Sequence, residues 1–117
     1  MHIVFRVLTI ATLLVVASTR PALAGDRQDA GADKGKAVYA AQKCSMCHAI
    51  AGTGGKTSAL DGVGKKLSAA DIRAWIVTPK EMEAKSKSTK KPAMPDRYAK
   101  LPAADLDALV AYLASLK

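Results

Sequence analysis

The sequence predicts an all-α protein with long glycine-rich loops. Residues 102–117 begin with proline, which suits the first turn of a helix, and place Leu106, Leu109 and Leu113 at the spacing of one helix face. Residues 50–64 contain five glycines, a density that favours loops and close approach of backbones. No segment shows a clear strand pattern.

Residues 1–24 have the pattern of a secretory signal peptide. An apolar stretch at 7–17 follows a short polar beginning with His2 and Arg6, and the small residues of Ala22-Leu23-Ala24 stand at the positions that a signal peptidase reads. We expect cleavage after Ala24 and export to the periplasm. A retained membrane anchor is the alternative, but Arg20 and Pro21 interrupt the apolar stretch before it reaches the ~20 residues that span a bilayer.

The mature chain is predicted to be one small domain with a loose beginning. Residues 25–32 are polar and small, as in a flexible terminus, and residues 33–117 form the domain. Asp33 suits the N-cap of a first helix. The whole chain has a formal net charge of +8, which falls to about +6 without Arg6 and Arg20 of the leader.

The middle of the chain predicts a second helix and a basic loop. Ser68 suits the N-cap of this helix, and Pro79 marks its end. Between them, one apolar helix face is formed by Ile72, Trp75 and Ile76. A further short helical piece and a lysine-rich loop follow at 80–84 and 85–91.

The pentapeptide Cys44-Ser45-Met46-Cys47-His48 has the spacing that attaches a c-type haem. Two thiols separated by two residues can add to the two vinyl groups of a porphyrin, and the adjacent imidazole can bind the iron. Cys-x-x-Cys alone also occurs in thiol redox enzymes and zinc sites, or could form a disulfide. The appended histidine favours haem attachment.

His48 is the only histidine after the predicted cleavage site, so a second histidine ligand is excluded within the mature chain. The sixth coordination position of the haem iron could then be filled by methionine, lysine, a chain terminus or water, or could be empty. Met94 stands between two prolines that disfavour helix and stiffen the loop, and we expect it to be the ligand. Met46 lies within the attachment loop, and its position there prevents it from reaching across the porphyrin to the opposite face of the iron. Met82 lies on a helix, where packing or a haem-edge contact is expected.

A thioether ligand favours ferrous iron, so His/Met coordination raises the reduction potential. Filling both axial positions also argues against oxygen binding and peroxide chemistry, which need an open iron. The ligand set therefore predicts an electron-transfer protein and no enzyme activity of its own.

These residues resemble a class I cytochrome c of the small bacterial periplasmic kind. The resemblance implies three to five short helices wrapped around one covalently attached haem, with glycine-rich loops, and a close crossing of the first and last helices at Gly35 and Tyr112. The matching positions are Gly35, Tyr39, 44–48, 60–64, 75–76, Pro79, 94–95 and 109–113.

One departure concerns the partner of the proximal histidine. The family usually has Gly-Pro before the Leu60 region, with a proline carbonyl accepting the histidine proton, whereas this chain has Thr57-Ser58. We expect the Ser58 carbonyl to accept from His48 instead. Trp75 is expected to pack beside the haem or to bond a propionate, with an electron relay as the alternative.

The leading hypothesis for function is a one-electron carrier between redox proteins. A basic rim would steer encounters with acidic docking surfaces, although these lysines also suit a merely solvated loop. No nucleic-acid-reading motif and no membrane insertion after cleavage are expected. The candidate rim residues are Lys43, Lys56, Lys85, Lys87, Lys90 and Lys91.

Two other functions remain open at this point. The chain could be the haem subunit of a periplasmic oxidoreductase complex, for example one that oxidises sulfur compounds or alcohols. Gas sensing or peroxidase activity is the third hypothesis, and it requires an open iron.

Overall fold

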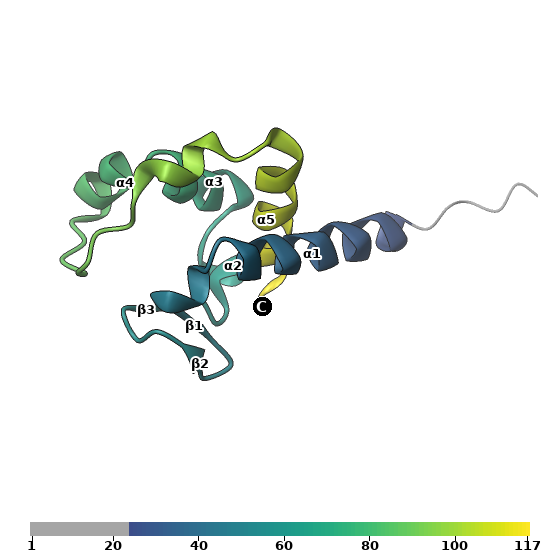
Figure 1. Ribbon diagram of the computed structural model, residues 1–117, viewed down its shortest axis with the longest axis horizontal. Helices are drawn as coiled ribbons and strands as arrows, with labels where there is room; N and C mark the ends of the chain where they lie inside the picture. Colours follow the sequence, from purple (N-terminus) through teal and green to yellow (C-terminus); the bar gives the residue numbers. More distant parts are fainter. Residues whose placement is uncertain (1–23) are drawn as a thin grey trace, which may run out of the picture.

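Helices α1 and α5 cross at the centre of the fold, and the remaining elements are arranged around them (Figure 1). The computed structural model describes residues 24–117, with side chains from residue 29 on. The predicted leader lies outside the described residues apart from Ala24. The mostly helical architecture confirms the all-α prediction. The helices are α1 (Ala24–Ala41), α2 (Val63–Lys66), α3 (Ala69–Val77), α4 (Pro79–Ser86) and α5 (Ala103–Ser115), with 3-10 turns η1 (Cys44–Met46) and η2 (Asp96–Lys100).

A small sheet lies in the glycine-rich segment, and here the expectation of no strand was wrong. Strands β1 (His48–Ile50), β2 (Thr53–Gly54) and β3 (Ser58–Ala59) are arranged in the order β2-β1-β3. β2 pairs antiparallel to β1, and β3 pairs parallel to it with His48 opposite Ser58. Strands of two or three residues are too short to show alternation in the sequence.

The first helix begins at Ala24, so residues 25–32, predicted as a loose terminus, are helical. Contacts with α5 reach Gly31, within these added turns. A Cβ placed on Gly31 would lie 3.9 Å from the Cβ of Ala111, so the two helix backbones are close there. Lys34 forms an ion pair with Asp105 at 3.1 Å. Tertiary contacts of this kind outweigh the weak helix propensity of glycine.

The predicted crossing of the first and last helices is present. A Cβ on Gly35 would overlap the carbonyl oxygen of Ala108 and would lie 2.5 Å from the Cβ of Tyr112. The rings of Tyr39 and Tyr112 meet edge to face, with centroids 5.9 Å apart. The absence of a side chain at Gly35 therefore allows α1 and α5 to pack at backbone distance.

The core lies between α1, α3, α5 and η2. The α3 N-cap is Ser68 as predicted, because its Oγ accepts from the Asp71 N–H at 3.1 Å. Pro102 is the N-cap of α5 and not its first helical residue. The buried hydrophobic side chains of the core cluster are Val38, Tyr39, Ile72, Ile76, Tyr98, Leu106, Leu109, Val110 and Leu113.

Within residues 24–117, no helix combines the length and apolar content that a bilayer crossing requires.

Candidate functional site

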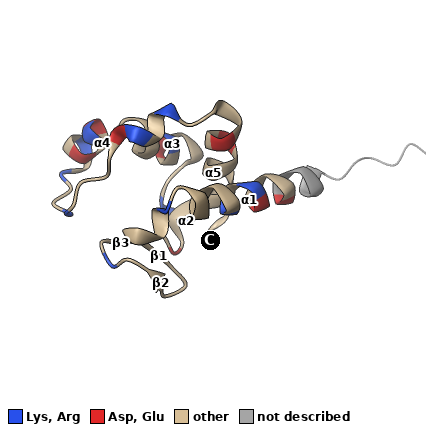
Figure 2. Cartoon of the chain, viewed as in Figure 1, with Lys and Arg blue, Asp and Glu red and all other residues tan. Residues whose placement is uncertain are grey.

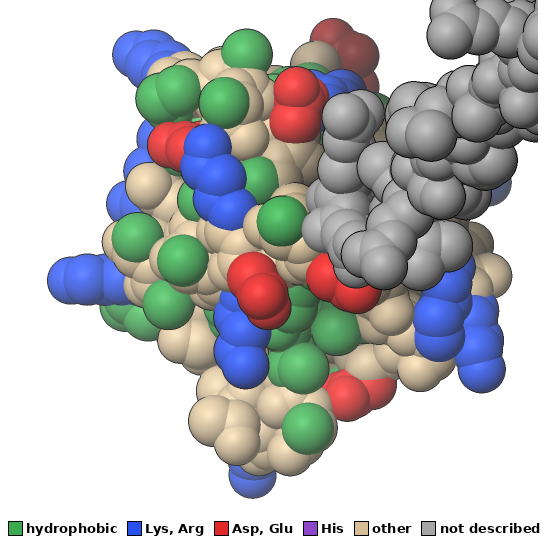
Figure 3. All heavy atoms as spheres, turned by 90° about the vertical axis from the view of Figure 1, so that its right-hand side faces the viewer, with side chains coloured by type: hydrophobic (Ala, Val, Ile, Leu, Met, Phe, Trp, Pro, Cys, Tyr) green, Lys and Arg blue, Asp and Glu red, His purple; other side chains and the backbone are tan. Residues whose placement is uncertain are grey.

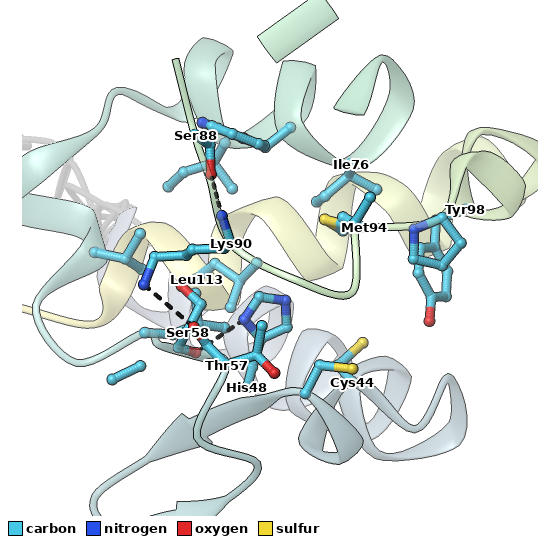
Figure 4. Close-up of a pocket in the computed structure, with 18 of the residues that line it drawn as sticks. Cys44, His48, Thr57, Ser58, Ile76, Ser88, Lys90, Met94, Tyr98 and Leu113 are labelled. Atoms are coloured by element: carbon cyan, nitrogen blue, oxygen red, sulfur yellow. Dashed lines mark hydrogen bonds between the residues drawn. The ribbon is translucent and has the colours of Figure 1, made fainter. Parts of the chain in front are cut away.

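A cavity of about 630 Å³ separates the attachment pentapeptide from the loop that precedes η2 (Figure 4). Cys44, Cys47 and His48 line one side of it, and Met94 lines the opposite side. Apolar side chains supply much of the remaining wall. They come from α1, α2, α3 and α5 and include Tyr39, Val63, Ile72, Ile76, Leu109 and Leu113.

The imidazole of His48 is oriented by Ser58. Its Nδ1 lies 3.0 Å from the Ser58 carbonyl oxygen, as expected from the sequence. A carbonyl can only accept, so Nδ1 carries the proton and Nε2 keeps a free lone pair. The parallel pairing of β1 with β3 brings these two residues together. The Tyr39 hydroxyl donates to the His48 carbonyl at 3.1 Å and anchors the backbone of the same residue.

The surroundings of His48 favour its neutral form. Burial lowers the pKa of the imidazole, and the positive charge of Lys90 lowers it further, while the hydrogen bond to Ser58 acts in the opposite direction. A neutral imidazole with one free nitrogen is the form that binds a metal.

Both cysteine thiols are free and half-buried, and they lie at opposite ends of the turn around η1. The Cys47 N–H donates to the Cys44 carbonyl at 3.2 Å, which closes this turn. Burial raises the pKa of the Cys44 thiol, whereas its backbone hydrogen bond and the charge of Arg97 lower it. The pentapeptide thus presents two thiols and one imidazole to the same cavity.

The three methionines of the described residues occupy different environments. Met94 is half-buried, lines the cavity and packs against the core (Figure 4). Met46 is 72 % exposed. Met82 does not line the cavity, which favours packing over a haem-edge contact among the two roles expected for it. Glu83 and Ser86 of α4 line the cavity, whereas Met82, one turn before Ser86, does not.

Trp75 lines the cavity from α3 and is half-buried, as its apolar helix face predicts. Sequence reasoning missed Arg97 and Tyr98, which line the cavity from η2. Arg97 donates to the Tyr98 hydroxyl at 2.9 Å, and that hydroxyl lies 3.5 Å from the Gln42 carbonyl. The contact between Tyr98 and Gln42 joins segments far apart in the chain, so no local sequence pattern could have predicted it.

The family model for cytochrome c matches residues 32–117. The chain belongs to the cytochrome c family. A search of curated proteins and a search of solved structures each found no match. Members of this family are electron-transfer proteins that bind haem c covalently through its porphyrin, and the helical fold described above is a cytochrome c domain.

The site of this cytochrome c fits such a group. The cavity holds two free thiols, an imidazole with an available Nε2 and a thioether, which are ligand types suited to haem iron and its covalent attachment. Its apolar walls suit a porphyrin. Its charged lining residues are four cations and one carboxylate, a balance that suits two propionates: Lys43, Lys66, Lys90, Arg97 and Glu83.

Proposed function

We propose that this cytochrome c carries one haem, bonded through Cys44 and Cys47 and ligated by His48 and Met94, and that it transfers single electrons between periplasmic redox proteins. One observation carries the proposal. The imidazole and the thioether line the same cavity from opposite sides, one beside the two thiols and the other on a separate loop (Figure 4).

The attachment step needs only the two thiols and the haem vinyl groups. Each S–H adds across one vinyl C=C bond, so the sulfur bonds to carbon, the proton is taken up by the other carbon, and no oxidant is required. The chain contains a single Cys-x-x-Cys-His sequence, which supports one haem.

His48 suits the proximal ligand because Ser58 holds its ring in the tautomer that leaves Nε2 free. Met94 suits the distal ligand because it lines the cavity from the loop opposite the pentapeptide. Met46 also lines the cavity, but it belongs to the attachment turn and is 72 % exposed, and Met82 does not line the cavity. Prolines at 92 and 95 restrict the loop that carries it.

Ligation of the iron by both His48 and Met94 favours a role in electron transfer and argues against a role in bond-making chemistry. His48 and Met94 would together hold the iron from both sides of the cavity, so the haem group would supply one-electron redox chemistry and would leave no position open for oxygen or peroxide. Fast binding of carbon monoxide to the native ferrous protein would contradict this and support a sensor or peroxidase.

The ligand assignment is tested with two methionine variants of the purified holoprotein. Met94→Ala should abolish the far-red sulfur-to-iron absorption band of the ferric protein and lower the reduction potential. Met82→Ala is the matched control and should retain both. The reverse pattern would overturn the assignment.

Charge around the cavity supports redox partners with acidic docking surfaces. Lysines occur in the loop after α4 and in the loop between β2 and β3 (Figure 2), and Lys90 of the first loop lines the cavity. On the face shown in Figure 3, acidic and basic side chains interleave instead. An unbalanced positive rim attracts an acidic surface, and an interleaved face does not.

A subunit of a periplasmic oxidoreductase complex remains the second candidate. Such a subunit needs a persistent apolar interface. Among the residues whose side chains are described, Met46 is the single exposed large hydrophobic residue, which favours a transient carrier. Stoichiometric co-purification with a catalytic protein would favour the subunit.

Export rests on the signal-peptide pattern of residues 1–24. N-terminal sequencing of the protein from the periplasmic fraction should begin at Gly25. A chain that retains Met1 would contradict cleavage.

A further inference from the structure

The loop at residues 87–95, here called the Met94 loop, is weakly tied to the rest of the fold. It begins where Lys87 ends α4 in a left-handed conformation (φ 54°). Its first two residues bond back to α4, with Lys87 N–H donating to Ala84 O at 3.4 Å and Ser88 N–H to Glu83 O at 3.1 Å. Two of its last four residues are prolines, which lack an N–H. Backbone bonding therefore does little to hold the part of the loop that carries Met94.

Lys90 supplies a connection across the cavity. Its Nζ donates to the Thr57 carbonyl oxygen at 3.2 Å, and its N–H lies 3.4 Å from the Ser88 Oγ (Figure 4). Within residues 24–117, the Nζ bond is the one hydrogen bond that joins the Met94 loop to the pentapeptide side of the cavity. Opening of the loop must break it.

Thr57 is a well-anchored acceptor for this bond. The next residue, Ser58, accepts from His48 Nδ1 at 3.0 Å and donates its own N–H to the Cys47 carbonyl at 3.2 Å. The Thr57 carbonyl is therefore held in register with both His48 and Cys47. Lys90 thus connects the loop that carries Met94 to the segment that orients His48.

We propose that Lys90 is a positioning residue that latches the Met94 loop across the cavity and so keeps the Met94 thioether in place. The proposal rests on His48/Met94 ligation of the haem. Lys90 touches neither the iron nor Met94 in this role; it acts by lowering the population of open loop. A hydrogen bond from a charged donor is stronger than a neutral one, but exposure of Lys90 weakens it, so we expect a latch worth about 3- to 10-fold in that population.

The test measures how readily imidazole displaces the distal ligand in the ferric holoprotein. An external ligand binds only when the loop opens, so its apparent affinity follows the open population. Lys90→Ala should raise the imidazole affinity by about 3- to 10-fold. Lys91→Ala is the matched control, because it removes the same charge from the adjacent position, and it should change the affinity less than about 2-fold. Lys90→Arg keeps a charged donor and should remain close to wild type.

A second measurement uses no ligand. Amide hydrogen exchange at residues 88–94 should be faster in Lys90→Ala than in Lys91→Ala, while exchange in α5 stays the same in both. Equal effects of the two alanine variants in both measurements would show that charge alone acts and would overturn the latch.

The two proposals fail in different ways. A wild-type ferric protein without the sulfur-to-iron band would overturn ligation by Met94, whatever the variants of Lys90 do. Unchanged loop exchange in Lys90→Ala would overturn the latch even where that band is intact.

Discussion

Gly55 packs directly against the backbone of Cys47. A Cβ at Gly55 would lie 2.8 Å from the Cα of Cys47 and would overlap the carbonyl oxygen of Met46. The Gly55 N–H also donates to the Ser45 carbonyl at 2.8 Å. The back of the turn that carries Cys44 and Cys47 is therefore covered by a backbone that has room only for glycine.

Gly55→Ala should lower the yield of protein with covalently attached haem, because the added methyl group forces the turn that holds both cysteines to move. The yield is measured as the ratio of haem absorbance to protein after identical expression and maturation. Gly52→Ala is the control: nothing lies within 4 Å of its Cβ, but its φ of 77° strains any side chain. It should lose stability by about 1 kcal/mol and still carry haem. Equal haem yields from the two variants would contradict the role of Gly55.

Substitution by alanine at two glycines of α1 should change the free energy of unfolding in opposite directions. Gly35→Ala should reduce the free energy of unfolding by about 1–3 kcal/mol or more, since its Cβ overlaps the backbone of α5. Gly31→Ala places its Cβ 3.9 Å from that of Ala111, an ordinary contact, and should stabilise the helix by about 0.5–1 kcal/mol. Urea unfolding followed by Trp75 fluorescence measures both. A neutral Gly35→Ala would show that α1 and α5 cross elsewhere.

Tyr39 should make folding sensitive to alkaline pH. Burial raises the pKa of its phenol to about 12, with smaller contributions from Cys44 and Tyr112. The folded pKa lies above the ordinary value of 10, so the contribution of the neutral phenol is complete below about pH 10 and is lost as the pH rises toward 12. Urea unfolding between pH 8 and about 12 should therefore show a smaller loss of stability for Tyr39→Phe than for wild type. Parallel pH profiles would contradict the shifted pKa.

The basic rim should accelerate reaction with an anionic oxidant. Oxidation of the ferrous protein by ferricyanide, measured by stopped flow, should slow as ionic strength rises from ~0.01 M to ~1 M, because the screening length falls from ~30 Å to ~3 Å. Lys43→Gln removes a charge that lines the cavity and should lower the low-salt rate. Lys36→Gln removes an exposed charge on α1 that does not line it, and should have a smaller effect. A rate independent of salt would contradict steering.

Local patterns predicted the elements whose residues interact with near neighbours in the chain. Ser68 caps α3 because its hydroxyl reaches the N–H of a residue three positions on, and the apolar stripe of α5 is buried as its spacing indicates. The sheet and the early start of α1 escaped prediction. The strands have only two or three residues, too few to show alternation, and α1 contacts a distant segment at Gly31, where an added Cβ would lie 3.9 Å from that of Ala111.

By itself, the sequence predicted the attachment chemistry, because Cys44, Cys47 and His48 lie within five residues at the spacing that attaches a c-type haem. It also indicated Ser58 as the partner of His48. The tertiary structure decided that Met94 and not Met82 faces the cavity, and that Lys90 reaches Thr57. The reason is physical: the direction in which a side chain points across a cavity depends on how helices and loops pack, and residues far apart in the chain set that packing.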